Sequence, residues 1–309
     1  MQTASMRTAY GEALVEAGRE NKNIVVLEAD LSKATKTSLF AKAFPERFFN
    51  IGIAEQNMMS MAAGFATCGK VPFATALAVF ASMRALEQVR TSVCIGNLNV
   101  KIGAPYGGLA TAENGPTHQC ISDINMMRGL PNMTVLAPSD AVSCKACVHW
   151  AVKHKGPVYI RILRDGEPVL YEKKEDVNIE NGNRLHEGND MAIICNGFTS
   201  HMALQAAEEL TKEGMHVTVH DIFCIKPIAA DVILDIAQKC KRIITVEEHN
   251  IYGGLGSAVA EVISQSRPVP LKIMGVNDYF SDSGSHKDLL ERAGLTVENI
   301  IRQVKDFVE

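Results

Sequence analysis

A single acid, Glu55, lies in the stretch 49–69 (FNIGIAEQNMMSMAAGFATCG), directly before a run of small and apolar residues. The spacing of the apolar residues after Glu55 predicts a helix that is buried over most of its surface, with Glu55 in the first turn. Backbone N–H groups at a helix start favour negative charge, so Glu55 could simply complement the helix dipole. A carboxylate among apolar residues could instead share a proton with a bound base, and this makes Glu55 a candidate catalytic group.

A second candidate lies in the long segment 106–119, which ends in the residues ENGPTHQ. A loop of this length between a strand and a helix is usually functional. Gly115 and Pro116 would turn and stiffen the loop and present His118 just before a helix begins. An imidazole can exchange a proton near neutral pH, which makes His118 a candidate for acid–base work, with a surface or capping role as the alternative.

Arginines are the candidates for binding an anionic substrate group. Arg161 and Arg164, in the segment RILR, follow an apolar run that is typical of a strand, and Arg7 lies near the N-terminus. Both guanidinium groups at the strand end are expected near the carboxyl edge of the sheet, where they could bind phosphate in a forked geometry. The alternative for each arginine is a solubilising surface charge.

Two further motifs carry little functional weight. The segment GGLG at 253–256 could suggest a phosphate cradle, but no lysine follows it as a P-loop requires, so we favour close packing at a strand–helix turn. Cys144 and Cys147 have a metal-like spacing, but no second pair follows, and the segment 139–154 reads as a helix. Small buried thiols are therefore the better interpretation, and no metal site is predicted in this chain.

Strands and helices alternate along the chain, which predicts an α/β fold with two doubly wound domains whose sites lie at the carboxyl ends of parallel strands. The run 24–30 (IVVLEAD) is typical of a buried parallel strand that ends in acids. The polar segment 171–187 is expected to be a linker between a first domain (1–170) and a second domain (188–309). Further strands are expected at 70–80, 98–105, 133–137, 157–162, 191–197, 216–222, 242–247 and 270–276.

Composition sets limits on the class of protein. The chain has 309 residues, of which 47% are hydrophobic and 21% are charged, and its formal net charge is −4. These values are typical of a globular protein and give no sign of a nucleic-acid or anionic-membrane partner. No apolar run is long enough to span a bilayer, and the N-terminus lacks the apolar core of a signal peptide, so we expect a cytoplasmic protein.

The segment 53–58 (IAEQNM) resembles the catalytic-glutamate segment of the transketolase superfamily of thiamin diphosphate enzymes. The resemblance implies that Glu55 holds N1′ of the aminopyrimidine ring and so promotes formation of the thiazolium ylid. It also implies that Phe80 stacks on the aminopyrimidine, with Leu77 in the pocket wall. Asp30 lines up with a family aspartate near the cofactor, and helix capping is its alternative role.

The resemblance extends to the residues that would bind substrate. The segment 113–119 is similar to the Asp-Gly-Pro-Thr-His-Gln segment of transketolases, which implies that His118 helps to handle substrate and intermediate oxygens. Asn114 stands where the family has an aspartate that reads a substrate hydroxyl, and its amide keeps a hydrogen bond but loses the charge. Positions equivalent to Arg7 and Arg164 bind phosphate in the family, and Arg161 matches an arginine of deoxyxylulose-phosphate synthases.

The resemblance covers the pyrimidine-binding domain and the C-terminal domain of transketolase. The family's diphosphate-binding domain carries a Gly-Asp-Gly motif and a distant Asn that hold Mg²⁺, and no Gly-Asp-Gly occurs in this chain. The hard oxygen ligands that Mg²⁺ requires are therefore expected from a partner chain. We interpret the sequence as the C-terminal subunit of a split transketolase, with the cofactor between the two chain types of an α₂β₂ assembly.

The expected activity is transfer of a two-carbon ketol unit from a ketose or ketose phosphate to an aldose or aldose phosphate through the thiamin diphosphate ylid. The alternatives are the β subunit of a 2-oxoacid dehydrogenase E1 component and a non-catalytic scaffold. The segment 113–119 and the arginine pair argue against the first alternative. The joint presence of Glu55, Phe80 and His118 argues against the second. The sequence does not specify the sugars or the partner.

Overall fold

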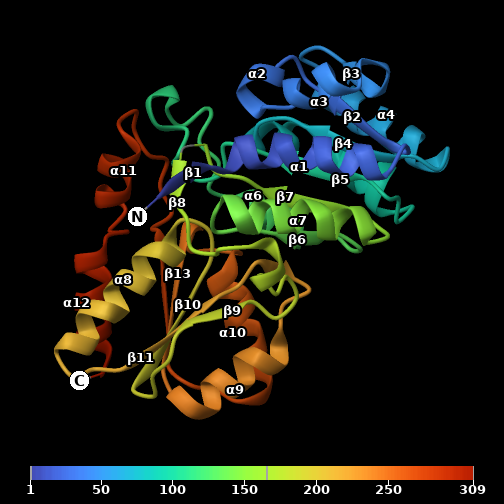
Figure 1. Ribbon diagram of the computed structural model, residues 1–309. Helices are drawn as coiled ribbons and strands as arrows, with labels where there is room; N and C mark the ends of the chain where they lie inside the picture. Colours follow the sequence, from blue (N-terminus) through green and yellow to red (C-terminus); the bar gives the residue numbers. More distant parts are fainter. Residues whose placement is uncertain (1, 165, 309) are drawn as a thin grey trace.

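The computed structural model describes residues 2–164 and 166–308, and over these ranges the chain forms two large sheets flanked by helices. Figure 1 shows the first sheet and its helices in blue to green, apart from the edge strand β12, and the second in yellow to red. The predicted α/β fold with two doubly wound domains is confirmed.

The first sheet has the strand order β12–β6–β7–β5–β4–β2–β3. Neighbouring strands are parallel except at the edge pair β12–β6. The run IVVLE forms β2 and is buried along its whole length, as expected for a central strand covered on both faces. The strands are β2 (Ile24–Glu28), β3 (Phe48–Asn50), β4 (Val71–Thr75), β5 (Lys101–Ala104), β6 (Thr134–Leu136), β7 (Val158–Arg161) and β12 (Cys224–Lys226).

Helices pack on both faces of the first sheet. On one face, α1 (Met6–Glu20), α3 (Ser38–Ala43) and α7 (Ala141–Lys153) bury their apolar stripes against the strands. On the other face lies α4 (Glu55–Thr67), whose buried residues include Met58, Met59 and Ala62. The short helices α2 (Ser32–Thr35) and α6 (Asp123–Arg128) follow strand ends at the carboxyl edge.

The second sheet has the order β14–β13–β10–β11–β9, with β9 as an antiparallel edge strand. Its strands are β9 (Asn183–His186), β10 (Met191–Cys195), β11 (Val217–Asp221), β13 (Ile243–Asn250) and β14 (Leu271–Val276). Its helices are α8 (Thr199–Lys212), α9 (Ala230–Cys240), α10 (Leu255–Ser266), α11 (His286–Arg292) and α12 (Val297–Val308). Apolar side chains of α9 and α10 belong to the same core as those of α4, so the two domains share buried surface.

The predicted linker 171–187 differs from the structure, because this segment is packed. Tyr171, Val177 and Ile179 are buried, and β9 within it extends the second sheet. The segment Gly166–Pro168 forms β8, which pairs with β1 (Thr3–Ser5). In addition, β12 crosses back to the first sheet, so the chain does not divide cleanly at residue 188. These pairings between distant segments have no local sequence signal.

The helical segment Phe80–Cys94 is irregular. Wide π-helical turns, η2 (Phe80–Arg84) and η3 (Val89–Cys94), flank the short α5 (Leu86–Gln88). The Ser82 hydroxyl donates to the Ala78 carbonyl, which a regular helix would offer to a backbone N–H. None of the helices in the described residues is long and apolar enough to cross a bilayer.

Candidate active site

The predicted catalytic acid, Glu55, is the first residue of α4 and is 1% exposed. Nη1 of Arg84 donates to both of its carboxylate oxygens, at 3.0 Å and 2.9 Å. The Arg84 side chain is itself 43% exposed. The acid is therefore buried beneath a cation that reaches the surface, and movement of Arg84 would open it to another partner.

Phe80 and His118 meet beside this ion pair. Their ring centroids are 5.4 Å apart in an edge-to-face arrangement, and the Arg84 guanidinium carbon lies 4.3 Å from the Phe80 ring centroid. His118 Nδ1 is 2.9 Å from the Thr117 hydroxyl. The structure thus links Glu55 to Phe80 through Arg84, and Phe80 to His118 through the contact of their rings. Sequence reasoning missed Arg84, although its position four residues after Phe80 places both on one side of a helical segment.

Leu77 and Asp30 lie at the carboxyl ends of neighbouring strands, β4 and β2. Leu77 is buried, whereas Asp30 is exposed, has a left-handed backbone (φ 61°) and accepts a hydrogen bond from Asn50 Nδ2 at 3.0 Å. Asp30 does not cap α2, whose preceding residue is Leu31. The alternative role in helix capping is therefore not observed.

Sequence reasoning also missed Glu28, the last residue of β2. Its carboxylate accepts hydrogen bonds from the Leu31 N–H and the Thr35 hydroxyl. Burial raises the pKa of Glu28 to about 7, and the nearby carboxylates of Asp30 and Glu55 act in the same direction. A group that titrates near neutral pH therefore lies beside the candidate acid. The sequence signal for Glu28 is its place directly after the apolar run 24–27, where a buried strand ends.

Arg7 and Arg164 converge on Tyr106, which follows β5. Arg7 Nη1 donates to the Tyr106 hydroxyl at 2.9 Å and to the Ala34 carbonyl at 2.7 Å. The guanidinium carbons of Arg7 and Arg164 lie 4.9 Å and 5.6 Å from the Tyr106 ring centroid. Tyr106 has a left-handed backbone (φ 67°), a conformation typical of functional sites for a residue other than glycine. We call Arg7, Tyr106 and Arg164 the arginine–tyrosine cluster.

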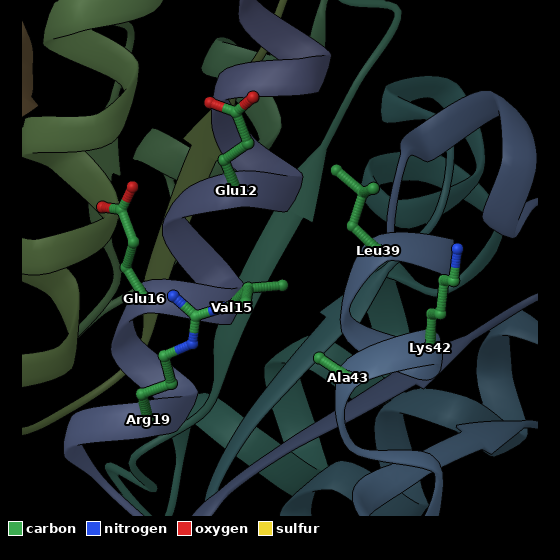
Figure 2. A pocket seen from close by; sticks show the side chains of 7 residues that line it. All are labelled: Glu12, Val15, Glu16, Arg19, Leu39, Lys42 and Ala43. Carbon is green, nitrogen blue, oxygen red and sulfur yellow. The ribbon is translucent and has the colours of Figure 1, made fainter.

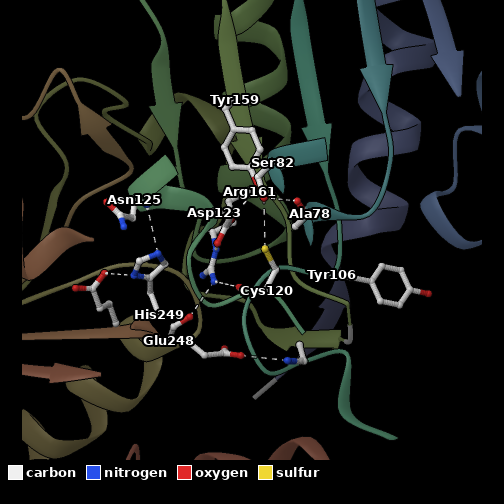
Figure 3. A network of polar contacts seen from close by, with 12 residues as sticks. Ala78, Ser82, Tyr106, Cys120, Asp123, Asn125, Tyr159, Arg161, Glu248 and His249 are labelled. Atoms are coloured by element: carbon white, nitrogen blue, oxygen red, sulfur yellow. Dashed lines mark hydrogen bonds and ion pairs between the residues drawn. The ribbon is translucent and has the colours of Figure 1, made fainter. Parts of the chain in front are cut away.

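Arg161 does not join this cluster, and its predicted role as a substrate ligand is corrected. The Arg161 side chain is 3% exposed, and its Nε donates to both Asp123 carboxylate oxygens, at 3.2 Å and 3.0 Å. Its Nη2 donates to the backbone carbonyls of Cys120 and Glu248 (Figure 3). Arg161 is the last residue of β7 and is paired with Asp123, whereas Arg164 lies beyond the strand and contacts the loop at Thr111. We assign Arg161 to the interface between the domains.

Asn114 is exposed in η4 (Ala112–Asn114), within the loop that ends at His118. Arg164 Nη1 donates to the Thr111 carbonyl of the same loop at 3.0 Å. Ala112 has a φ of 54°, which is strained for a residue with a Cβ. The loop is thus held in a specific conformation next to the arginine–tyrosine cluster.

The GGLG segment does not form an anion cradle that is open to ligands. The backbone N–H groups of Leu255 and Gly256 donate to the carboxylate of Glu247, at 2.7 Å and 2.8 Å. An internal anion therefore occupies the start of α10, and burial raises the pKa of that carboxyl to about 7.

The two cysteines with a metal-like spacing lie inside one helix. Cys144 and Cys147 are both buried in α7, and burial raises the pKa of each thiol. Within the described residues, no group of three or more His, Cys, Asp or Glu side chains is arranged to hold a metal ion.

A surface hollow of about 360 Å³ lies between α1 and α3 (Figure 2). Its lining mixes carboxylates and cations with apolar side chains, and it contains none of the predicted site residues. The lining residues are Glu12, Val15, Glu16, Arg19, Leu39, Lys42 and Ala43.

Comparison with known families matches both parts of the chain. Residues 2–166 match the transketolase pyrimidine-binding domain, and residues 180–300 match the transketolase C-terminal domain. A putative transketolase C-terminal section from Methanocaldococcus jannaschii is 44% identical, over 97% of this chain and 95% of the relative. A 6-deoxy-6-sulfo-D-fructose transketolase subunit from a Clostridium species is 36% identical, over 98% and 94% of the two chains.

Solved structures agree with these matches. A split-gene transketolase, described as an inactive β₄ tetramer, is 48% identical with a TM-score of 0.92 over 98% of this chain and 97% of that one. Transketolase from Campylobacter jejuni shares the fold, with a TM-score of 0.83 at 22% identity, and this chain covers 47% of it. The protein therefore belongs to the transketolase family and corresponds, over nearly its whole length, to the C-terminal section of a split transketolase.

Proposed function

We propose that this chain is the pyrimidine-binding subunit of a two-chain transketolase, which moves a two-carbon ketol unit from a ketose or ketose phosphate to an aldose or aldose phosphate. One observation carries the proposal: the buried carboxylate of Glu55 lies with Phe80 and His118 at the sheet edge that also holds the arginine–tyrosine cluster. This edge combines an acid, an aromatic face, an imidazole and a cationic group, which ketol transfer to or from an anionic sugar requires.

The residues at this edge fit thiamin diphosphate. Glu55 is a buried acid beneath a partly exposed arginine, and the half-buried aromatic ring of Phe80 lies beside the same arginine. In our proposal Glu55 holds N1′ of the aminopyrimidine, Phe80 stacks on that ring, and Leu77 and Asp30 line the pocket. Bound thiamin diphosphate supplies a carbon that stabilises the carbanion formed when the C–C bond beside a ketose carbonyl breaks.

The chain's own side chains would then act on protons and charge. Glu55 holds a proton at the N1′ position, and Arg84 must leave the carboxylate for this to occur. His118 donates a proton to, or accepts one from, the substrate oxygens, and Asn114 on the same loop offers an amide to a substrate hydroxyl. Arg7 and Arg164 bind the anionic end of the sugar beside Tyr106.

A partner chain completes the site in this proposal. It supplies the diphosphate-binding domain with its Mg²⁺ ligands, in an α₂β₂ assembly that we expect in the cytoplasm. The names of relatives support a divided enzyme, since several are transketolase subunits or sections. Two such subunits belong to enzymes for 6-deoxy-6-sulfo-D-fructose and apulose 4-phosphate, sugars with an anionic group, which agrees with the arginine–tyrosine cluster.

Reconstitution tests the proposal. The chain is mixed with a chain carrying a transketolase diphosphate-binding domain, thiamin diphosphate and Mg²⁺, and two-carbon transfer between sugar phosphates is measured. We expect transfer by the mixture and none by either chain alone. Turnover by this chain alone would contradict the divided site. Decarboxylation of a 2-oxoacid with transfer to a lipoyl acceptor, in place of ketol transfer, would favour an E1 component.

A further inference from the structure

The loop that carries His118 is closed at its base by a backbone bridge. Gly108 N–H donates to the Cys120 carbonyl at 2.7 Å, and Cys120 N–H donates to the Gly108 carbonyl at 3.0 Å. The loop 109–119 therefore leaves and re-enters the body of the protein at one point. Contacts at this point therefore help to fix the position of His118.

A carboxylate from the second domain holds the base of the loop. Glu248, on β13, lies close to Arg161 (Figure 3) and is 1% exposed. Its Oε1 accepts hydrogen bonds from the N–H groups of Leu109 at 2.6 Å and Ala110 at 3.2 Å. His286 Nε2 lies 3.1 Å from the same oxygen. Burial alone would raise the pKa of Glu248, but the neighbouring His286 and Arg161 hold it below its ordinary value, so the carboxylate is charged.

Gly108 provides the space that this contact needs. A Cβ at Gly108 would lie 2.4 Å from Glu248 Oε1, and the residue has a φ of +73°. Either condition alone favours glycine, because a side chain would displace the carboxylate or strain the backbone. The turn is therefore shaped around the carboxylate of another domain.

The other end of the loop is bound to the same strand. Arg161 Nη2 donates to the carbonyls of Cys120, at 3.2 Å, and Glu248, at 2.8 Å, and Asn250 N–H donates to the Ile121 carbonyl at 2.8 Å. Both ends of the loop thus contact β13 directly or through Arg161. This arrangement explains why Arg161 is buried.

We propose that Glu248 is a positioning residue through which the second domain fixes the loop 109–119, and with it His118, in the arrangement used for catalysis. The inference rests on the proposed function for the role of His118, whereas the contact between Glu248 and the loop does not. It gives the second domain a part in the reaction, although the proposed catalytic groups lie in the first.

Hydrogen exchange of the isolated chain tests the contact without any cofactor or partner. Glu248→Leu removes the acceptor and leaves two buried N–H groups unpaired, so peptides covering 108–120 should exchange about tenfold faster or more. Glu247→Leu is the matched control, because Glu247 is the adjacent residue, is equally buried and also accepts from two backbone N–H groups. Its effect should fall on 250–258 and spare 108–120.

Steady-state kinetics of the reconstituted enzyme test the consequence. Glu248→Leu should lower kcat about tenfold or more, with the KM for the sugar changed less than about threefold, because substrate binding groups are retained. Glu248→Gln keeps one acceptor oxygen and should recover most of kcat. Should the leucine variant fail to fold, Glu248→Asp, which keeps the charge but shortens the side chain, replaces it in both experiments.

The outcomes separate the two proposals. Unchanged exchange at 108–120 in Glu248→Leu, or an equal increase in Glu247→Leu, would overturn the positioning role. Faster loop exchange with an unchanged kcat would also overturn it, because the loop would then not serve the reaction. If the wild-type assembly transfers no ketol unit, the proposed function fails, and the exchange experiment still decides whether Glu248 holds the loop.

Discussion

The carboxyl edges of the two sheets differ in how they use their polar groups. At the first edge Glu55 lies beneath a partly exposed arginine, Phe80 and His118 are half-buried, and two arginines flank Tyr106. At the second edge, the adjacent carboxylates Glu247 and Glu248 are buried and accept backbone N–H groups from within the chain. One fold thus has one edge that we propose to bind ligands and one whose carboxylates bind its own backbone.

The comparison shows that the carboxyl edge of a doubly wound sheet does not by itself form a ligand site, because its polar groups can instead bind the protein's own backbone. Glu247 neutralises the start of α10, which would otherwise attract an anion. Glu248, facing the other way, reaches the loop that carries His118. The second edge therefore supports the first through internal bonds.

The largest expected effect comes from Glu55→Gln in the reconstituted enzyme. An amide cannot hold a proton at a ring nitrogen as a carboxyl group does, so kcat should fall about a thousandfold, within the ~10²–10⁴ range of acid–base catalysis. Glu247→Gln, the corresponding change at the second edge, should alter kcat by less than about twofold. Equal losses in both variants would remove the functional distinction between the edges, and an active Glu55→Gln enzyme would favour a scaffold role.

Gly108→Ala should lower the free energy of unfolding by about 3 kcal/mol, since a methyl group would both meet Glu248 and strain a backbone of positive φ. Gly214→Ala separates the two causes, because Gly214 has a φ of +85° but nothing within 4 Å of an added Cβ. Gly214→Ala should lower the free energy of unfolding by only about 1 kcal/mol. If the two variants had similar midpoints of denaturant unfolding, the contact with Glu248 would add nothing to the cost of a side chain at position 108.

Much of the fold and part of the candidate site could be predicted from the sequence, because their signals are local. The apolar run before Glu28 gave a buried strand with an acidic end, and the spacing after Glu55 gave a helix that begins at that residue. The length of the loop before His118 predicts a functional role, which stays a prediction. Each of these features depends on residues within about twenty positions of one another.

The remaining features depend on pairing between distant segments. Arg161 is 38 residues from Asp123 and 87 from Glu248, and nothing near any of them indicates that they meet. The expectation for Arg161 treated two nearby arginines as equivalent, although Arg161 ends β7 in a buried ion pair with Asp123 and Arg164 lies beyond the strand. The packing of 171–187 and the return of β12 to the first sheet have the same cause.

Arg7→Met tests whether the arginine–tyrosine cluster serves a ligand or only the chain itself. Loss of a charged hydrogen bond to an anion, worth about 1.5–3 kcal/mol, should lower kcat/KM for sugar phosphates about 10- to 100-fold and barely affect unphosphorylated sugars. Arg19→Met, at the exposed far end of α1, is the control and should change neither. A uniform loss for both substrate types would place Arg7 with the internally bonded groups of the second edge.

The smallest effect concerns the pH dependence of stability in Glu247→Gln. The folded pKa of Glu247 is raised to about 7 from an ordinary 4.5, so the folded state binds the proton more tightly. Its contribution to stability is present below pH 4.5 and is lost as the pH rises through 7. The variant should therefore reduce the fall in unfolding free energy between pH 6 and pH 7 by about 1 kcal/mol.

Glu248→Gln should change the pH dependence of stability on the acid side instead, because the folded pKa of Glu248 is lowered whereas that of Glu247 is raised. Its contribution is present above an ordinary carboxyl pKa and is lost as the pH falls, so this variant should flatten the acid limb below pH 4.5 and leave the interval from pH 6 to pH 7 unchanged. Denaturant unfolding at each pH measures both. If the two variants changed the same interval, the neighbouring acids would share one environment, and the distinction between a carboxylate that caps α10 and one that holds the His118 loop would be lost.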